Sequence, residues 1–139
     1  MQPKDIKYIV VHCSDSPHRG DTAEDIHRWH QERGFDGIGY HKVIREDGKE
    51  ENGRPLYWPG AHVRGHNSHS WGICLLGTDT FTKAQIARLG AVIQRMKNLA
   101  PQAKLVGHRD LDGGKTCPNF ELLDNYELIK GDIIKWKNL

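Results

Sequence analysis

The chain has 139 residues, a length that fits one compact domain. Hydrophobic residues make up 37% of the chain and charged residues 27%, which is typical of a globular protein and excludes a disordered or fibrous one. The formal net charge of +2 is far from the concentrated basic charge of a dedicated nucleic-acid-binding protein, so no nucleic-acid partner is expected.

The first half of the chain predicts a buried strand, a helix and a hairpin. In chain order these are a strand over residues 7–12 that ends at His12, a helix over 22–33, a strand over 40–45 and a polar edge strand over 49–52. The first strand is β-branched and aromatic and runs into a turn-rich stretch. Thr22 begins the helix, and Gly34 ends it. Asp47-Gly48, between the last two strands, is a strong hairpin signal.

The second half predicts two strands and two helices separated by long loops. In chain order these are a loop over 55–70, a central strand over 71–76, a helix from Thr82 to Pro101, a strand over 104–108, a glycine-broken loop over 112–118 and a helix-like stretch over 122–136. Thr82 and Gln85 form a capping box, and Pro101 prevents the helix from continuing. The loop over 55–70 is rich in Gly, His, Pro and Asn, so we interpret it as functional.

Alternating strands and helices predict an α/β fold, a single domain over residues 1–139 with a mixed central sheet of about five strands flanked by helices. Ligands of such sheets bind at the carboxyl ends of strands, where His12 and His108 are expected. No apolar run approaches the roughly 18 residues of a membrane helix, so no membrane insertion is expected. The N-terminus resembles no secretion signal, which predicts a protein made and kept in the cytoplasm.

The cysteines and histidines raise the question of a metal site. Three cysteines in a cytoplasmic protein do not favour a disulfide framework. Zinc binds imidazole nitrogen and thiolate sulfur, and a catalytic zinc takes three protein ligands and leaves a position for water. His12, His108 and Cys117 meet that count, because two of them end predicted strands and the glycines after His108 let the chain turn back. From spacing alone, a structural role for each histidine is the favoured alternative.

Other residues of these types compete for the role. His27 and His30 share a helix face, where one partly exposed and one packed side chain is the favoured arrangement. The loop over 55–70 carries three more histidines, for which substrate contact, metal binding and solvent exposure stay open. Cys13 and Cys74 are interpreted as small core residues, Cys13 because its side chain points away from that of His12 along the strand.

A series of short segments adds a specific pattern of ordered motifs. They lie at residues 10–14, 26–30, 39–44, 60–62, 66–67, 72–77, 107–110 and 115–118. In this order and spacing they resemble the zinc-dependent N-acetylmuramoyl-L-alanine amidases, and within them the short phage amidases called endolysins, which are related to the peptidoglycan recognition proteins. The resemblance covers the chain from about Ile6 to Pro118.

The resemblance implies an amidase fold like that of the peptidoglycan recognition proteins, one zinc ion per chain and a set of site residues. The matched residues are His12, His108 and Cys117 for zinc, Tyr40 and Lys115 for catalysis, and His62 and Asn67 for contact with the muropeptide stem. In such a site zinc activates water and polarises the carbonyl, the tyrosine orients or deprotonates the water, and the lysine stabilises the oxyanion. Members that only recognise peptidoglycan typically lack the cysteine ligand, so Cys117 favours an enzyme.

The implied activity is hydrolysis of the amide between N-acetylmuramic acid and L-alanine in peptidoglycan, by a phage or prophage endolysin that lyses its host. Without a secretion signal, the protein would reach the cell wall through a separate pore protein. Two alternatives stay open: a non-catalytic peptidoglycan-recognition module, and a secondary role as a regulator of phage RNA polymerase. We expect a monomer, although the sequence does not determine the oligomeric state.

Overall fold

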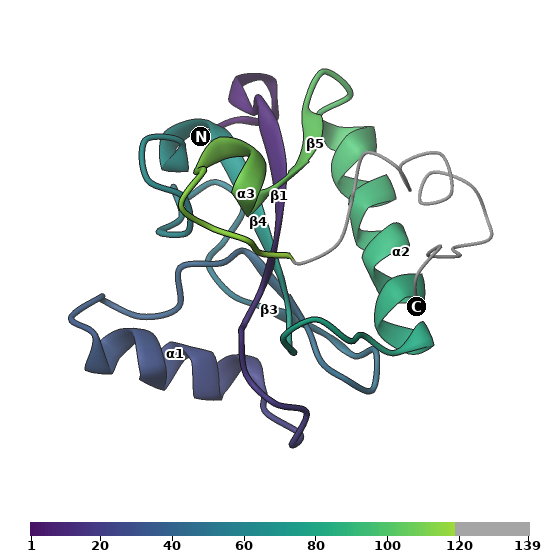
Figure 1. Ribbon diagram of the computed structural model, residues 1–139. Coiled ribbons are helices and arrows are strands. Elements are labelled where there is room, and N and C mark those ends of the chain that lie inside the picture. Colours follow the sequence, from purple (N-terminus) through teal and green to yellow (C-terminus); the bar gives the residue numbers. More distant parts are fainter. Residues whose placement is uncertain (119–139) are drawn as a thin grey trace.

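The computed structural model describes residues 1–118, which form a five-stranded sheet with a long helix on each face (Figure 1). The strands are β1 (Tyr8–Cys13), β2 (Lys42–Ile44), β3 (Glu50–Asn52), β4 (Ser70–Leu75) and β5 (Lys104–Gly107). The helices are α1 (Ala23–Glu32), α2 (Lys83–Leu99) and the short α3 (His108–Leu111), with 3-10 turns η1 (Pro3–Asp5) and η2 (Asn67–His69). The predicted α/β fold with a mixed sheet is confirmed, while the helix predicted over 122–136 lies outside the described residues.

The strand order places two candidate site residues side by side. The sheet runs β3-β2-β4-β1-β5, with β1 parallel to β4 and β5, β2 parallel to β4, and β3 antiparallel to β2 at one edge. Val11 of β1 pairs with Gly107 of β5. The residues that follow them, His12 and His108, therefore lie next to each other at the carboxyl ends of the two strands.

Alternation along the strands separates two packing faces. Ile9, Val11 and Cys13 lie in the core that packs against α2. Cys74 lies in the smaller core on the α1 face. His12 pairs with Cys74 in the β1–β4 ladder, so its side chain also lies on the α1 face, opposite to that of Cys13. The interpretation of Cys13 and Cys74 as small core residues is confirmed, since both are buried.

The β2–β3 hairpin is shorter than predicted. Gly48 adopts a φ of 85° in the turn, as the hairpin signal requires. β2 begins at Lys42 instead of Tyr40, because the carbonyl of Tyr40 accepts a hydrogen bond from the backbone of Arg54 outside the ladder. The chains approach so closely there that a Cβ at Gly53 would lie 2.1 Å from the Tyr40 oxygen. Tyr40 therefore lies in the loop before the strand.

Other boundaries also differ from the prediction, and β1 runs through Cys13 instead of ending at His12. Ser70 begins β4 instead of ending the loop, and η2 lies within that loop. β5 ends at Gly107 instead of His108, because the carboxylate of Asp110 accepts the Gly107 N–H at 2.7 Å and so caps α3. His108 is therefore the first residue of α3.

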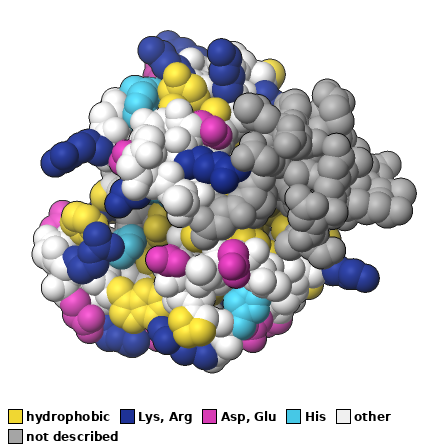
Figure 2. Space-filling view, in the orientation of Figure 1, with side chains coloured by type: hydrophobic (Ala, Val, Ile, Leu, Met, Phe, Trp, Pro, Cys, Tyr) yellow, Lys and Arg dark blue, Asp and Glu magenta, His cyan; other side chains and the backbone are white. Residues whose placement is uncertain are grey.

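The mixture of charges on the surface and the apolar content of the helices agree with what the composition predicts. On the face in Figure 2, basic and acidic side chains are interspersed. Within residues 1–118, no helix combines the length and the apolar character needed to cross a membrane.

Candidate functional site

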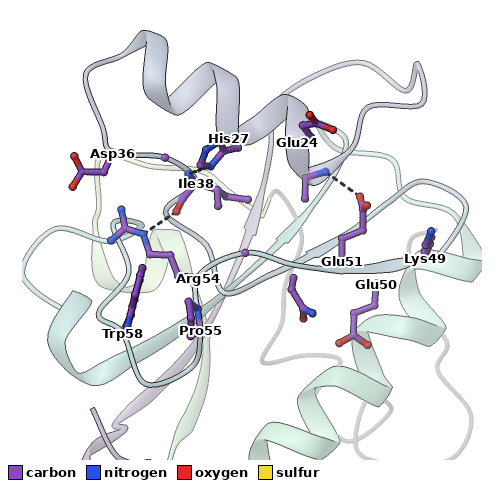
Figure 3. A pocket seen from close by; sticks show the side chains of 14 residues that line it. Glu24, His27, Asp36, Ile38, Lys49, Glu50, Glu51, Arg54, Pro55 and Trp58 are labelled. Carbon is purple, nitrogen blue, oxygen red and sulfur yellow. Dashed lines mark hydrogen bonds between the residues drawn. The ribbon is translucent and has the colours of Figure 1, made fainter.

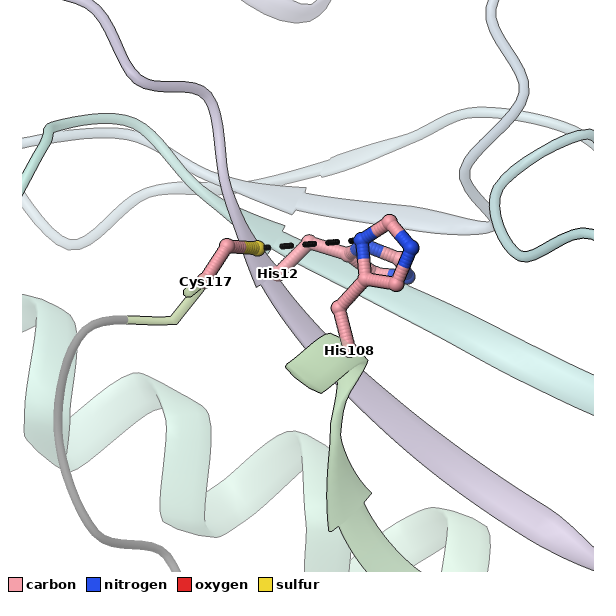
Figure 4. A group of neighbouring side chains, drawn as sticks. All are labelled: His12, His108 and Cys117. Carbon is pink, nitrogen blue, oxygen red and sulfur yellow. Dashed lines mark hydrogen bonds between the residues drawn. The ribbon is translucent and has the colours of Figure 1, made fainter. Parts of the chain in front are cut away.

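Three side chains with metal-binding donor atoms meet at the carboxyl ends of β1 and β5 (Figure 4). One donor atom from each of His12, His108 and Cys117 lies within 4.8 Å of the other two. The Nδ1 atoms of the two histidines are 3.0 Å apart, and Cys117 Sγ is 4.0 Å from His108 Nδ1. The structure thus brings together the three residues that the sequence predicts as ligands.

Backbone hydrogen bonds fold the loop after α3 back onto the sheet. The carbonyl of Asp112 accepts the N–H of Lys115, and the carbonyl of Cys117 accepts the N–H of Arg109, both at 3.0 Å. Cys117 Sγ in turn accepts the backbone N–H of Cys13 at 3.0 Å. These contacts hold the thiol beside the end of β1.

The other edge of the His12 ring is hydrogen-bonded to a second buried histidine. His12 Nε2 lies 2.8 Å from His62 Nδ1, and His62 Nε2 lies 3.2 Å from Ser70 Oγ. The Ser70 hydroxyl donates to the carbonyl of His66 at 2.7 Å. His12, His62 and Ser70 are all buried. Both ring nitrogens of His62 therefore have protein partners.

The donor chemistry of the site fits zinc. Burial lowers the pKa of His12 well below its usual value and also lowers that of His108, so both imidazoles are neutral near pH 7, the form that binds metals. The hydrogen bond with the Cys13 side chain, together with burial, raises the pKa of Cys117. A bound cation would oppose that shift, because it stabilises the thiolate. Two nitrogens and one sulfur are a ligand set that zinc accepts.

Tyr40 and Lys115 lie beside the three donors. The Tyr40 ring centroid is 5.0 Å from that of His12. Burial raises the pKa of Tyr40 well above its usual value, so its hydroxyl keeps its proton at neutral pH. Lys115 is exposed. Burial is the main cause of the lowered pKa of His108, and the nearby charge of Lys115 acts in the same direction.

His27 and His30 hold the segment that leads into Tyr40. His27 Nδ1 accepts the N–H of Ile38, and His30 Nδ1 accepts the N–H of Gly39, both at 3.0 Å. His27 is partly buried and His30 is buried, which confirms the arrangement predicted for this helix face. Their role in holding the loop was not predicted from the sequence, and their shared helix face is the signal that could have indicated it.

A cavity of about 1020 Å³ connects the predicted site residues. Its lining includes His12, Tyr40, His62, Asn67, His108, Lys115 and Cys117. Asn67 also folds the surrounding loop, because its Oδ1 accepts the backbone N–H groups of His62 and Val63, each at 2.9 Å. The residues predicted for metal binding, catalysis and substrate contact therefore face one space.

A second cavity, of about 740 Å³, lies between α1 and the edge strand β3 (Figure 3). Arg54 in its wall donates to the carbonyls of Ile38, at 2.8 Å, and Pro59, at 3.0 Å. Trp58, which also lines it, is 53% exposed. Among residues 1–118, the group of three donors suited to a metal ion lies in the first cavity. We therefore place the chemistry of the protein there.

Comparison with known proteins gives a consistent result. The family model for N-acetylmuramoyl-L-alanine amidase matches residues 2–120. The endolysin of Enterobacteria phage K11 is 37% identical over 123 residues, which cover 82% of this chain and 81% of the relative. Among solved structures, N-acetylmuramoyl-L-alanine amidase LysC from Clostridium intestinale URNW matches with a TM-score of 0.80 and 32% identity, over 92% of this chain and 85% of that chain. Wild-type Drosophila PGRP-LB matches with a TM-score of 0.74 and 29% identity, over 81% of this chain and 74% of that chain.

Proposed function

This chain belongs to the N-acetylmuramoyl-L-alanine amidase family, and we propose that it hydrolyses peptidoglycan with one zinc ion held by His12, His108 and Cys117. The observation that carries the proposal is the meeting of two neutral imidazole nitrogens and one thiol at the carboxyl edge of the sheet. Three protein ligands leave the fourth position that a catalytic zinc needs for water. We extend the assignment to the whole chain, residues 1–139, as a single amidase domain.

The bond cleaved is the amide between N-acetylmuramic acid and L-alanine. When bound, zinc would supply a Lewis acid for the carbonyl of this amide and lower the pKa of a water molecule. Tyr40, which is protonated at neutral pH, would orient the attacking water through its hydroxyl oxygen, give its own proton to the departing amine and take up the proton that the water loses, so that it ends the reaction protonated. The ammonium group of Lys115 would place positive charge where negative charge develops on the carbonyl oxygen.

We infer that the muropeptide stem lies in the cavity that these residues share, in contact with His62 and Asn67. Asn67 would use its amide nitrogen, because its Oδ1 already accepts two backbone N–H groups. His62 would use the edge of its ring, because both of its nitrogens have protein partners.

The similarity to phage endolysins supports a role in lysis of a bacterial host. We propose that the protein reaches the cell wall through a separate pore protein. A non-catalytic recognition module is not favoured, because the three donors, Tyr40 and Lys115 line the same cavity. The monomeric state and the regulation of phage RNA polymerase stay predictions.

The proposal is tested by the rate at which purified peptidoglycan loses turbidity. We expect no activity from the metal-depleted protein and recovery on addition of one equivalent of zinc, with no recovery on addition of magnesium. If the protein kept its full rate after metal analysis had shown zinc to be absent, a zinc-dependent mechanism would be excluded.

A further inference from the structure

We propose that His62 and Ser70 are positioning residues that hold the proton of His12 on Nε2 and so keep His12 Nδ1 available for a metal ion. The inference rests on the proposed function, because it concerns a ligand of the proposed zinc site. It is carried by the direction of three consecutive hydrogen bonds, two buried and the last partly buried, which end at the backbone carbonyl of His66.

The direction follows from the number of protons available. A serine hydroxyl has one proton, and that of Ser70 is donated to the carbonyl of His66 at 2.7 Å. Toward His62 Nε2, 3.2 Å away, the Ser70 oxygen can therefore only accept. A neutral imidazole also carries one proton, so His62 is protonated on Nε2 and its Nδ1 is an acceptor. His12 Nε2, 2.8 Å from that Nδ1, must then be the donor.

This direction determines which nitrogen of His12 can bind a metal. With its proton on Nε2, the neutral His12 ring has its lone pair on Nδ1. That atom faces His108 Nδ1 at 3.0 Å, within the group of three donors. The opposite tautomer would place a proton between the two Nδ1 atoms and block the ligand position. A hydrogen bond to the second nitrogen of a metal-binding histidine also fixes its orientation and raises its basicity.

The His62 ring is held in a narrow slot between two glycines. A Cβ built at Gly72 would lie 2.7 Å from His62 Cγ, and one built at Gly60 would lie 2.6 Å from His62 Cδ2. Real Cβ atoms do not approach so closely, so both positions require glycine to admit the ring. The buried ring has His12 and Ser70 as hydrogen-bond partners and no carboxylate among these contacts, so a charged imidazolium there would be costly. The slot therefore favours one ring orientation and the neutral ring.

The test compares zinc affinities of full-length proteins by competition with a chromophoric chelator. His62→Phe keeps a ring in the slot but removes both nitrogens, and we expect zinc binding to weaken by about 10–100-fold, the range typical of such outer contacts. His62→Asn offers Oδ1 as an acceptor to His12 Nε2–H and should recover most of that loss. His69→Phe makes the same exchange at a histidine outside the chain of hydrogen bonds and should bind zinc like the wild type.

These outcomes separate the inference from the proposed function. A wild-type protein that binds no zinc would contradict the proposed function. A folded His62→Phe variant with wild-type zinc affinity would overturn only the inference. If His62→Phe does not fold, His62→Asn and a folded His62→Leu variant replace it in the test. Wild-type zinc affinity in His62→Asn, together with weaker zinc binding in His62→Leu, would also support the role of the acceptor.

A second measurement reads the proton positions directly. Long-range ¹⁵N–¹H correlation spectra of the zinc-loaded wild type should show His12 and His62 protonated on Nε2. Ser70→Ala removes the acceptor for His62 Nε2–H, and we expect a mixture of His62 tautomers with a smaller loss of zinc affinity than in His62→Phe. A wild-type His62 protonated on Nδ1 would overturn the proposal.

Discussion

The backbone N–H of Cys13 donates to Sγ of Cys117 at 3.0 Å, although the two residues are 104 positions apart in the sequence. The contact joins the last residue of β1 to the loop that follows α3. It places the Cys117 thiol beside His12 although the side chains of Cys13 and His12 lie on opposite faces of the sheet. The Cys13 side chain and burial raise the pKa of Cys117, and the N–H that points at the sulfur acts in the opposite direction, toward the thiolate. The fold thus positions Cys117 beside His12 through the backbone of a neighbouring strand.

Replacement of Cys117 by serine should abolish stoichiometric zinc binding, because it removes the sulfur donor from the group of three. Activity on peptidoglycan should fall with the zinc content, measured by metal analysis of the purified protein. Cys74→Ala is a suitable control for zinc content, because Cys74 is buried in the α1 core and is not one of the three donors. It is not a control for activity, because the Cys74 side chain contacts that of Tyr40. Cys13 is less suitable, since it contacts Cys117 directly. A Cys117→Ser protein with one zinc ion and full activity would refute the ligand assignment.

Replacement of Tyr40 by phenylalanine should lower turnover and leave zinc binding unchanged. The variant keeps the ring that lies 5.0 Å from His12 and 5.5 Å from His30 between centroids, and it loses only the hydroxyl. Loss of one acid–base group typically costs about 10²–10⁴-fold in rate. Steady-state kinetics on a soluble muropeptide measure the effect, with Tyr57→Phe as the control, because Tyr57 is 65% exposed and does not line the cavity. Equal rates for Tyr40→Phe and the wild type would exclude a catalytic role for the hydroxyl.

Replacement of Lys115 by alanine should reduce kcat more than it changes KM. The ammonium group is expected to act on charge that develops in the transition state, and loss of one such group typically costs about 10²–10³-fold. Lys83→Ala removes an exposed lysine at the start of α2 and should have no effect. If Lys115→Ala raised KM and left kcat unchanged, the lysine would bind substrate without contributing to the chemical step.

The metal-free protein should lose stability as the pH falls below about 6.5. Burial lowers the pKa of His12 and His41, and lowers that of His62 from 6.5 to about 3. The unfolded chain therefore binds these protons near pH 6.5, whereas the folded chain does not, so the free energy of unfolding decreases as the pH is lowered from about 6.5 toward about 3. His62 contributes about 1.4 kcal/mol per pH unit within that window, and the lowered pKa values of His12 and His41 change the stability in the same direction.

Urea unfolding of the metal-free protein at several pH values between neutrality and about pH 5 measures this slope. The slope should be smaller in His62→Asn, which lacks one of the buried imidazoles. A free energy of unfolding that does not change over this range would show that the histidines are not buried in their neutral form.

The sequence predicts the site to the extent that local patterns place its residues. β-Branched residues followed by a turn-rich stretch are enough to place His12 near the carboxyl end of a strand, one residue before its last residue, Cys13. The start of α3 could also have been read locally, because Asp110 lies three residues after Gly107 and caps the helix that His108 begins. The cavity that joins Tyr40 and Lys115 required the family resemblance, since neither residue shows its role by spacing alone.

Other features depend on contacts between distant segments and could not be predicted from local patterns. The pairing of Val11 with Gly107, which sets His12 beside His108, is a property of the β1–β5 register. The hydrogen bonds from His12 through His62 to Ser70 require β1, the long loop and β4 to be assembled. The sequence marks His62 only as one of several histidines in a loop.

The most direct test of the central claim is mass spectrometry of the products released from purified peptidoglycan by the zinc-loaded protein. Cleavage of the amide between N-acetylmuramic acid and L-alanine predicts stem peptides with free L-alanine amino groups and intact glycan strands without new reducing ends. New reducing sugar ends on fragments that still carry their stem peptides would show glycosidic cleavage and would contradict the assignment as an amidase.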